Sequence, residues 1–323
     1  MTAVTARAHT NIALIKYWGK LDQKLIIPQN SSLSLTLDHF YTDTTVEFSP
    51  KLRQDQIYLD KQQLTGPAAK RISRFLDLIR QQAHCQQFAY VDSTNHVPTA
   101  AGLASSASGF AALAAAASRA AGLQLERPAL SRLARRGSGS ATRSIYGGFV
   151  EWQQGHDDLT SLAVPFSEDV DFDIQMIAIV LNNQQKRVSS RSGMAEVVAT
   201  SPYYPAWVKA ANTDLISMKQ AILKKDINLI GQIAEGNAMK MHATTLSATP
   251  PFTYFEPKTL TAMQVIQNLR QDGYSCYYTM DAGPNIKVIC SAKETPAILE
   301  RLGHFFDQQQ LLVAKPGPGV QYL

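Results

Sequence analysis

A run of small residues between a strand and a long helix constrains the fold of this chain more than any other feature. Phe88 to Thr94 reads as a strand, Pro98 to Gly109 consists mainly of Gly, Ser and Ala, and an alanine-rich helix continues to Ala121. The most apolar stretch, Ala104 to Ala121, carries serines and Arg119 and lacks the ~20 strongly apolar residues of a membrane span. We therefore expect a packed globular protein without membrane association.

The length and the charge narrow the class further. A chain of 323 residues exceeds the ~250 residues that one hydrophobic core usually covers, so two domains are expected. The net charge of +5 is small for this length; it does not require nucleic acid, and it suits a site for an anionic small molecule. Three widely spaced cysteines predict neither a disulfide framework nor a zinc site, and Met1 to Thr10 lacks an apolar signal core. A cytoplasmic protein with free thiols is expected.

The order of the predicted elements indicates the α+β class, because strands and helices do not alternate as regular parallel-sheet units. In the first half, Leu33 to Phe48 predicts two paired strands, and Pro67 to about Gln82 predicts a helix. The other predicted helices are Pro128–Arg136, Pro205–Leu223, Ile227–His242, Pro257–Asp272 and Thr295–Asp307, and the other strands are Gly148–Gln153, Phe172–Leu181, Tyr274–Met280, Ile286–Ser291 and Leu311–Ala314. We place a domain boundary near residue 184, which gives domains 1–184 and 185–323.

The small-residue segment is suited to an anion. In Pro98-Thr-Ala-Ala-Gly-Leu-Ala-Ser-Ser-Ala107, small side chains allow backbone N–H groups to approach a ligand, and a helix start adds unpaired N–H donors. Ser105 and Ser106 add hydroxyls for a phosphate oxygen or a metal. No Gly-Lys-Ser/Thr occurs in the chain, so this is not a Walker loop. A tightly packed start of an alanine-rich helix explains the composition equally well.

A second loop, Arg135-Arg-Gly-Ser-Gly-Ser-Ala-Thr-Arg-Ser144, interleaves two glycines with two serines. Residues after Gly137 could start a helix, with Ser138 and Ser140 as donors to an anion. Arg143 could bind a phosphate or carboxylate through its planar guanidinium. The alternative is a solvated loop with surface arginines, but two anion-suited loops in one chain favour a function.

Three more segments carry charges that fit such a site. Asn11 to Lys20 is an apolar strand that ends in two lysines beside aromatic rings and a glycine, although snorkelling lysines explain this segment alone. Met280 to Asn285 places Asp281 at a Gly-Pro turn, where it serves either as a turn residue or as a group that orients or deprotonates a hydroxyl. Lys186 to Met194 is either a charged loop or a further set of anion-binding cations.

Together these segments resemble the GHMP small-molecule kinase superfamily, and within it the diphosphomevalonate decarboxylase family. The matching segments, in chain order, are Asn11–Lys20, Asn30–Ser34, Pro98–Ala107, Gly137–Arg143, Tyr146–Phe149, Ser190–Met194 and Asp281–Asn285. Tyr-Trp-Gly-Lys and Asp-Ala-Gly-Pro-Asn are specific to the decarboxylase branch. The sequence departs from the family at Thr142, where Cys is frequent, and at Gln29, where Thr is common. The resemblance implies a GHMP kinase-like two-domain fold, with an N-terminal ribosomal-protein-S5-like α+β domain, a C-terminal ferredoxin-like α+β domain and an active-site cleft between them.

The resemblance also implies a reaction and its site residues. The family uses ATP and Mg²⁺ to phosphorylate the 3-hydroxyl of mevalonate 5-diphosphate, after which phosphate and CO₂ leave and isopentenyl diphosphate forms. Asp281 and Lys16 would be catalytic. The implied substrate-binding residues are Tyr17, Trp18, Gly19, Lys20, Ser138, Gly139, Ser140, Ala141, Thr142, Arg143, Arg191 and Met194. The implied ATP-binding residues are Pro98, Ala100, Ala101, Gly102, Leu103, Ser105, Ser106, Arg71 and Lys186, with Ser105 also a possible Mg²⁺ ligand.

Which of Arg143 and Arg191 meets the substrate carboxylate stays open. The family is commonly homodimeric, so a homodimer is implied. Three other readings remain: a mevalonate or phosphomevalonate kinase that does not decarboxylate, a catalytically silent sensor, and a nucleic-acid binder. Lys16 and Asp281 together argue against the first two. The scattered placement of the basic residues in Gly/Ser loops argues against the third, so we expect neither a nucleic-acid nor a membrane partner.

Overall fold

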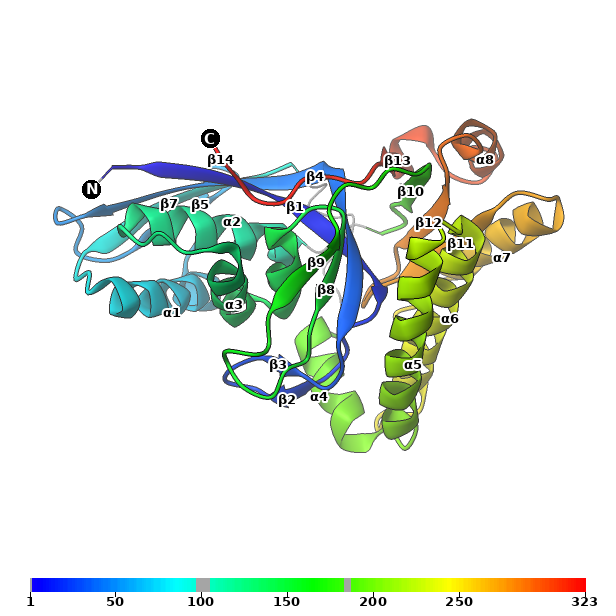
Figure 1. Cartoon of the computed structure of the whole chain (residues 1–323), viewed down its shortest axis with the longest axis horizontal. Coiled ribbons are helices and arrows are strands. Elements are labelled where there is room, and N and C mark those ends of the chain that lie inside the picture. The colour runs from blue at the N-terminus through cyan, green and yellow to red at the C-terminus, as the bar shows by residue number, and fades with distance from the viewer. Residues whose placement is uncertain (1, 97–104, 183–186) are drawn as a thin grey trace.

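The computed structural model describes residues 2–96, 105–182 and 187–323, in which two sheets are flanked by helices (Figure 1). The larger sheet is built mainly from the first half of the chain, in the order β14-β1-β4-β7-β5-β6, with β8 and β9 joined to it through β4. Its strands are β1 (Val4–Ile15), β4 (Ser32–Ser49), β5 (Gln56–Leu59), β6 (Gln62–Gln63), β7 (Phe88–Asn95), β8 (Phe149–Trp152), β9 (Ala163–Ser167) and β14 (Gln321–Tyr322). A separate hairpin consists of β2 (Lys20–Asp22) and β3 (Ile27–Pro28).

The longest strand, β4, corrects one prediction. Leu33 to Phe48 does not form two paired strands, because all of it lies in β4, which pairs with β1 on one side. Asp38 and His39 interrupt the alternation, and the β1–β4 register shifts nearby, between His9 and Asn11. The interruption is therefore a local irregularity within a strand and not a turn between two strands.

Three helices cover one face of the larger sheet: α1 (Gly66–Ala83), α2 (Ser105–Ala120) and α3 (Arg127–Gly137). The alanine-rich α2 lies against β1 and β4 and is buried on almost every side. Its small side chains permit this close approach of a helix to a sheet. The residues after Gly137 form the 3₁₀ helix η1 (Gly139–Ile145), which follows α3 directly.

The smaller sheet is antiparallel, in the order β11-β12-β10-β13. Its strands are β10 (Ile174–Ile179), β11 (Cys276–Met280), β12 (Ile286–Ser291) and β13 (Leu311–Ala314). One face packs against α7 (Pro257–Gln271) and α8 (Thr295–Leu302). The other face packs against α5 (Tyr204–Leu223) and α6 (Ile227–Leu246). The remaining short elements are α4 (Ser190–Thr200) and η2 (Gln308–Gln310).

One hydrophobic core joins the two halves. Leu14 and Leu35 from the larger sheet pack with Met218 of α5, Ile230 of α6 and Ile289 of β12. The C-terminal segment also connects the halves. After β13 the chain returns to the larger sheet, where β14 pairs with β1 at the far end (Figure 1). The shared core and the β14–β1 pairing thus hold the two halves of the chain against each other.

The two-domain α+β class is confirmed, and most predicted elements are present with ends shifted by a few residues. The last helix is shorter than predicted, since α8 ends at Leu302 and not at Asp307. The predicted boundary at residue 184 lies outside the described residues and stays a prediction, although β10 precedes it and belongs to the smaller sheet. Within the described ranges, no helix is both long and apolar enough to cross a membrane, and the three cysteines are free and buried.

Candidate active site

The two residues predicted to be catalytic form an ion pair across the two halves of the chain. Lys16 follows the end of β1, and its Nζ lies 2.9 Å from Oδ1 of Asp281, which follows the end of β11. The Lys16 side chain is only 2% exposed, whereas that of Asp281 is 26% exposed. Burial lowers the pKa of Lys16, and the Asp281 carboxylate opposes this shift. The pair therefore presents a partly accessible carboxylate backed by a buried ammonium group.

Backbone contacts fix the position of Lys16. Its Nζ also donates to the carbonyl of Ala13 at 2.7 Å, and its backbone N–H donates to Oδ1 of Asn237 in α6 at 2.9 Å. Its own carbonyl accepts from Nδ2 of Asn30 at 2.9 Å. Asn285 holds the turn that carries Asp281, because its Oδ1 accepts from the backbone N–H groups of Leu181 and Asn182. Both members of the pair are thus anchored to secondary structure.

The sequence analysis missed two buried residues beside Asp281. Lys287 in β12 places its Nζ 3.4 Å from Oδ2 of Asp281. His242 in α6 is fully buried, and burial together with Lys16 lowers its pKa to about 3, so the ring is neutral. The signal for Lys287 was present, since it is the one charged residue inside the apolar run Ile286 to Ser291. His242 lies near the end of an amphipathic helix, where a buried histidine has no distinguishing pattern.

Arg143 lies in η1 and is 2% exposed. Its Nε donates to Oδ1 of Asn11 at 3.1 Å and its Nη1 donates to Oγ of Ser32 at 2.7 Å. Burial lowers its pKa to about 10, and the charge of Asp281 opposes that shift. Arg143 is therefore a cation of the Asp281 region, and its contact with the substrate stays a prediction.

Aromatic rings form a wall beside this cation. The rings of Tyr17 and Trp152 lie 4.7 Å apart, and burial raises the pKa of Tyr17, which stays a neutral phenol. Gly139 lies against both rings, since a Cβ there would come within 2.8 Å of Tyr17 and 2.9 Å of Trp152. The glycine of the Ser-Gly-Ser loop is required for this close approach.

A second group of cations contains Lys20, Arg71 and Arg191. Burial lowers the pKa values of Lys20 and Arg71, and the charge of Arg191 lowers both further. Arg71 donates to the carbonyl of Gly137 at 2.7 Å. Cations that repel one another in this way are typical of a site that receives anions. Arg71, predicted on the ATP side, thus lies with two residues predicted on the substrate side.

The start of α2 meets the second anion-suited loop. Oγ of Ser106 lies 3.3 Å from Oγ of Ser138, and both Ser105 and Ser106 retain exposure. In the same loop, the carbonyl of Ser140 accepts a hydrogen bond from Nδ2 of Asn11 at 3.0 Å. The predicted ATP-binding residues Pro98, Ala100, Ala101, Gly102, Leu103 and Lys186 lie outside the described residues.

Other predicted substrate residues are buried behind the site. Trp18 and Met194 pack in one apolar cluster with Tyr204, whose hydroxyl donates to the Trp18 carbonyl at 2.8 Å. Gly19 adopts a φ of +112°, and a Cβ there would overlap the Tyr204 hydroxyl. Ala141 is fully buried, and the Thr142 hydroxyl bonds to Ser131, so the side chains of these two residues belong to the core beneath the loop.

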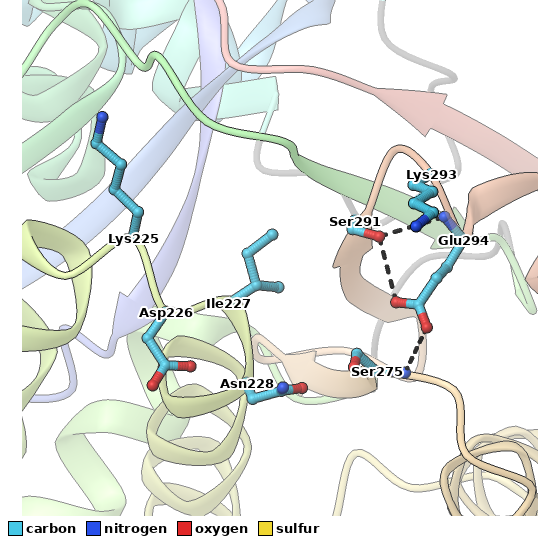
Figure 2. Close-up of a pocket in the computed structure, with 8 residues that line it drawn as sticks. All are labelled: Lys225, Asp226, Ile227, Asn228, Ser275, Ser291, Lys293 and Glu294. Carbon is cyan, nitrogen blue, oxygen red and sulfur yellow. Dashed lines mark hydrogen bonds between the residues drawn. The ribbon is translucent and has the colours of Figure 1, made fainter.

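A surface pocket of about 470 Å³ lies away from these residues and is lined by Lys225, Asn228, Ser275, Lys293 and Glu294, among others. The Glu294 carboxylate accepts from Oγ of Ser291 and from the backbone N–H of Ser275 (Figure 2). Lys225 is paired with Asp171 at 2.7 Å. Lys225 and Glu294 are thus engaged in contacts at the surface, unlike the buried lysines beside Asp281.

Comparisons with known proteins identify the family of this chain. Residues 8–163 match the diphosphomevalonate decarboxylase-like N-terminal domain, and residues 176–316 match the mevalonate 5-diphosphate decarboxylase C-terminal domain. The chain is 37% identical to the diphosphomevalonate decarboxylase of Ganoderma lucidum, with 95% of this chain and 82% of that protein covered. It is 35% identical to the Homo sapiens protein of the same name, with 92% and 78% covered.

Solved structures show the same relationship. The mevalonate diphosphate decarboxylase of Staphylococcus aureus superposes with a TM-score of 0.96 at 46% identity, and 99% of this chain and 98% of that chain are covered. A chain described as MDDEF in complex with MVAPP, AMPPCP and magnesium superposes with a TM-score of 0.95 at 50% identity, with the same coverage. The matches span both halves of the chain and include the segments that carry Lys16 and Asp281, so the chain belongs to the diphosphomevalonate decarboxylase family.

Proposed function

We propose that this chain converts mevalonate 5-diphosphate to isopentenyl diphosphate in an ATP-dependent decarboxylation that also yields ADP, phosphate and CO₂. The observation that carries the proposal is the Lys16–Asp281 ion pair, a buried cation and a partly exposed carboxylate contributed by the two halves of the chain. Arg143, Lys20 and Arg191 supply further positive charge, as a substrate with a diphosphate and a carboxylate requires. The complex of a 50% identical chain with MVAPP, AMPPCP and magnesium supports the same substrates here.

The chemistry follows from the substrate. A tertiary hydroxyl is a poor leaving group, so its oxygen first attacks the γ-phosphorus of ATP and displaces ADP, while its proton passes to the Asp281 carboxylate that it contacts. The new phosphate then leaves with the C3–O electron pair, and positive charge builds on C3. The electrons of the bond between C2 and the carboxylate carbon then form the C2=C3 double bond as CO₂ departs. Such catalysis depends on positioning and on fixed charges more than on covalent intermediates.

Each residue has a role in these steps. Asp281 would orient the 3-hydroxyl, and Lys16 would stabilise negative charge on the phosphoryl group that moves toward it. Tyr17, Lys20, Ser138, Ser140 and Arg143 would hold the diphosphate. Fixed cations at these places stabilise charge without reorganisation at the moment of reaction.

The nucleotide and its metal fit the start of α2. Backbone N–H groups of a helix start and the hydroxyls of Ser105 and Ser106 suit the ATP phosphates. Across the described residues, no group of three or more His, Cys, Asp or Glu side chains could hold a metal ion. Mg²⁺ in phosphate-transfer sites commonly keeps several waters and binds phosphates with one or two protein ligands, so a serine hydroxyl fits this donor set. When bound, Mg²⁺ would neutralise phosphate charge.

A coupled assay tests the proposal. The purified protein is incubated with mevalonate 5-diphosphate, ATP and Mg²⁺, and ADP and CO₂ are measured together. We expect the two products in equal amounts and no reaction after addition of EDTA. ADP without CO₂ would instead identify a kinase that stops at phosphorylation, and absence of both would refute the enzymatic function.

Two further properties belong to the same proposal. We infer a cytoplasmic homodimer, on the resemblance to the family and on the three free cysteines. Light scattering should give twice the mass of the 35.5 kDa chain. Fractionation of the source cells should place the protein in the cytoplasm.

A further inference from the structure

The carboxylate of Asp281 is held by two buried ammonium groups and not by one. Nζ of Lys16 lies 2.9 Å from Oδ1, and Nζ of Lys287 lies 3.4 Å from Oδ2. Each lysine side chain is 2% exposed. Lys16 follows β1 of the larger sheet and Lys287 lies in β12 of the smaller sheet, and each faces a different oxygen of the same carboxylate.

Lys287 occupies a place where the strand pattern calls for an apolar residue. In β12, Val288 and Cys290 pack against the α7–α8 side, and Ile289 packs in the core beneath α5 and α6. Lys287 lies on the same side as Ile289, opposite Thr279 of β11. A buried ammonium destabilises a fold unless it is paired, so a lysine here is expected only if its charge is used.

The contacts of Lys287 point to the catalytic turn. Besides Asp281, its Nζ contacts the carbonyl of Asn285 at 3.5 Å. The side chain of Asn285 bonds this turn to Leu181 and Asn182, which follow β10. Lys287 therefore touches both the reactive carboxylate and the backbone that carries it.

We propose that Lys287 is a positioning residue, which fixes the plane of the Asp281 carboxylate and keeps it ionised. With one oxygen held by Lys16 and the other by Lys287, rotation of the carboxylate about its Cβ–Cγ bond is restricted. The directions of the carboxylate lone pairs are then fixed, and the carboxylate can accept a hydrogen bond from the 3-hydroxyl. This inference rests on the proposed function, in which Asp281 meets that hydroxyl.

The charges around Asp281 determine how replacement of Lys287 should change the pH at which the carboxylate takes up a proton. Among the described residues, the groups that face the carboxylate include Lys16 after β1, Arg143 in η1, His242 in α6 and Lys287 in β12. His242 is neutral, so the three others supply the positive charge. Loss of one cation next to a carboxylate makes proton uptake easier. The carboxylate should then be protonated at a higher pH.

The experiment compares Lys287→Met, Lys287→Arg and the matched control Lys293→Met, a lysine exposed just beyond the end of β12. For Lys287→Met we expect a fall in kcat of about tenfold or more, a change in ATP-analogue binding of less than about twofold, and an acid limb of the kcat profile at higher pH. Lys287→Arg should restore the acid limb and part of kcat, and Lys293→Met should match the wild type. A Lys287→Met enzyme with kcat within about twofold of wild type and an unmoved acid limb would overturn the proposal.

A second measurement does not depend on turnover. In protein labelled with ¹³C at aspartate carboxyls, the Asp281 signal is assigned by its loss in Asp281→Asn. We expect its titration midpoint to be higher in Lys287→Met than in the wild type and to match the wild type in Lys287→Arg, whereas identical midpoints in all three proteins would overturn the role of Lys287. If the wild type released no CO₂, the proposed function would fail, and this titration would still decide whether Lys287 controls Asp281. If Lys287→Met does not fold, Lys287→Gln and Lys287→Arg provide the same comparison.

Discussion

At the scale of the residue, the most unusual feature of this protein is a group of buried cations. Lys16, Arg143 and Lys287 are all buried. Among them lies the carboxylate of Asp281. Within the part of the chain that the structure describes, three positive groups surround one carboxylate, and a surplus of positive charge in a poorly solvated place is costly. An anionic substrate would neutralise this positive charge on binding. Part of the affinity for the substrate would therefore come from cations that the fold already holds in place.

Replacement of Asp281 tests this arrangement directly. Asp281→Asn and Asp281→Ala should abolish formation of isopentenyl diphosphate, because neither side chain can orient the hydroxyl as an anion beside Lys16. Binding of an ATP analogue, measured by calorimetry, should persist. Turnover close to wild type in either variant would remove Asp281 from the mechanism.

Arg143→Gln should raise KM for mevalonate 5-diphosphate strongly, since the fork that would bind the diphosphate is lost. The structure adds a stability cost, because Asn11 and Ser32 each lose a hydrogen bond in a buried place; about 1–3 kcal/mol is expected. Steady-state kinetics and urea unfolding measure the two effects separately. Arg53→Gln, at an exposed position, is the control. An unchanged KM would exclude Arg143 from the diphosphate site.

His242 should make stability depend on pH. Its pKa in the fold is about 3 because of burial, below the ordinary value of 6.5, so between these pH values the unfolded chain binds a proton that the folded chain does not. Stability is therefore lost as the pH falls through this window, by at most about 1.4 kcal/mol per pH unit from this residue. His242→Phe should flatten the slope of unfolding free energy between pH 6 and pH 4, whereas His304→Phe, at an exposed position, should not. Equal slopes in all three proteins would contradict this account.

At the scale of the element, the sequence predicted those helices and strands whose ends are set by local residue patterns. The helices α1, α5 and α7 begin at or next to a proline and have apolar residues at helical spacing, and their predicted bounds agree with the structure within about two residues. The short strands β2, β3 and β6 carry little pattern of their own and form only because a partner strand lies beside them. The prediction for Leu33 to Phe48 failed for the related reason that long-range pairing with β1 decides whether an interruption becomes a turn.

Two glycines of α6 give a matched test of its packing against the smaller sheet. A Cβ on Gly231 would lie 2.2 Å from the ring of Tyr277 in β11, whereas a Cβ on Gly236 would meet nothing within 4 Å. Gly231→Ala should therefore destabilise the protein by about 1–3 kcal/mol through overpacking. Gly236→Ala should stabilise it by about 0.5–1 kcal/mol, because alanine favours the helix. Thermal and urea unfolding measure both, and the same sign for the two variants would show that α6 does not pack as described.

At the scale of the whole molecule, the candidate site is a product of how the two halves pack. Lys16 and Asp281 are 265 positions apart in the sequence, and no local pattern brings them together. Their roles could be predicted only through the family resemblance, and the second lysine, which that resemblance did not include, was missed. The core that contains Leu14, Leu35, Met218 and Ile289 is what sets their separation. Changes that loosen this core should weaken the site even where they touch none of its residues.

The returning C-terminal segment provides the last test, since it ties the two halves together outside that core. Gly317 N–H donates to the Thr36 carbonyl at 2.8 Å, the Gly317 carbonyl accepts from Gly148 N–H at 3.0 Å, and Val320 N–H donates to the Ile145 carbonyl at 3.2 Å. Deletion of residues 316–323 removes these bonds and the β14–β1 pairing. At about 0.5–1.5 kcal/mol for each bond, the unfolding free energy should fall by several kcal/mol.

Unfolding of the shortened chain should nevertheless remain a single transition, because the shared core still joins the halves. A control that lacks only residues 320–323 keeps the Gly317 contacts and should lose less stability. Calorimetry distinguishes one unfolding transition from two. For the chain that lacks residues 316–323, we expect one peak at a lower temperature than for the full chain. Two separate peaks would mean that the C-terminal segment, and not the core, couples the halves, and in that case the distance between Lys16 and Asp281 would depend on this segment.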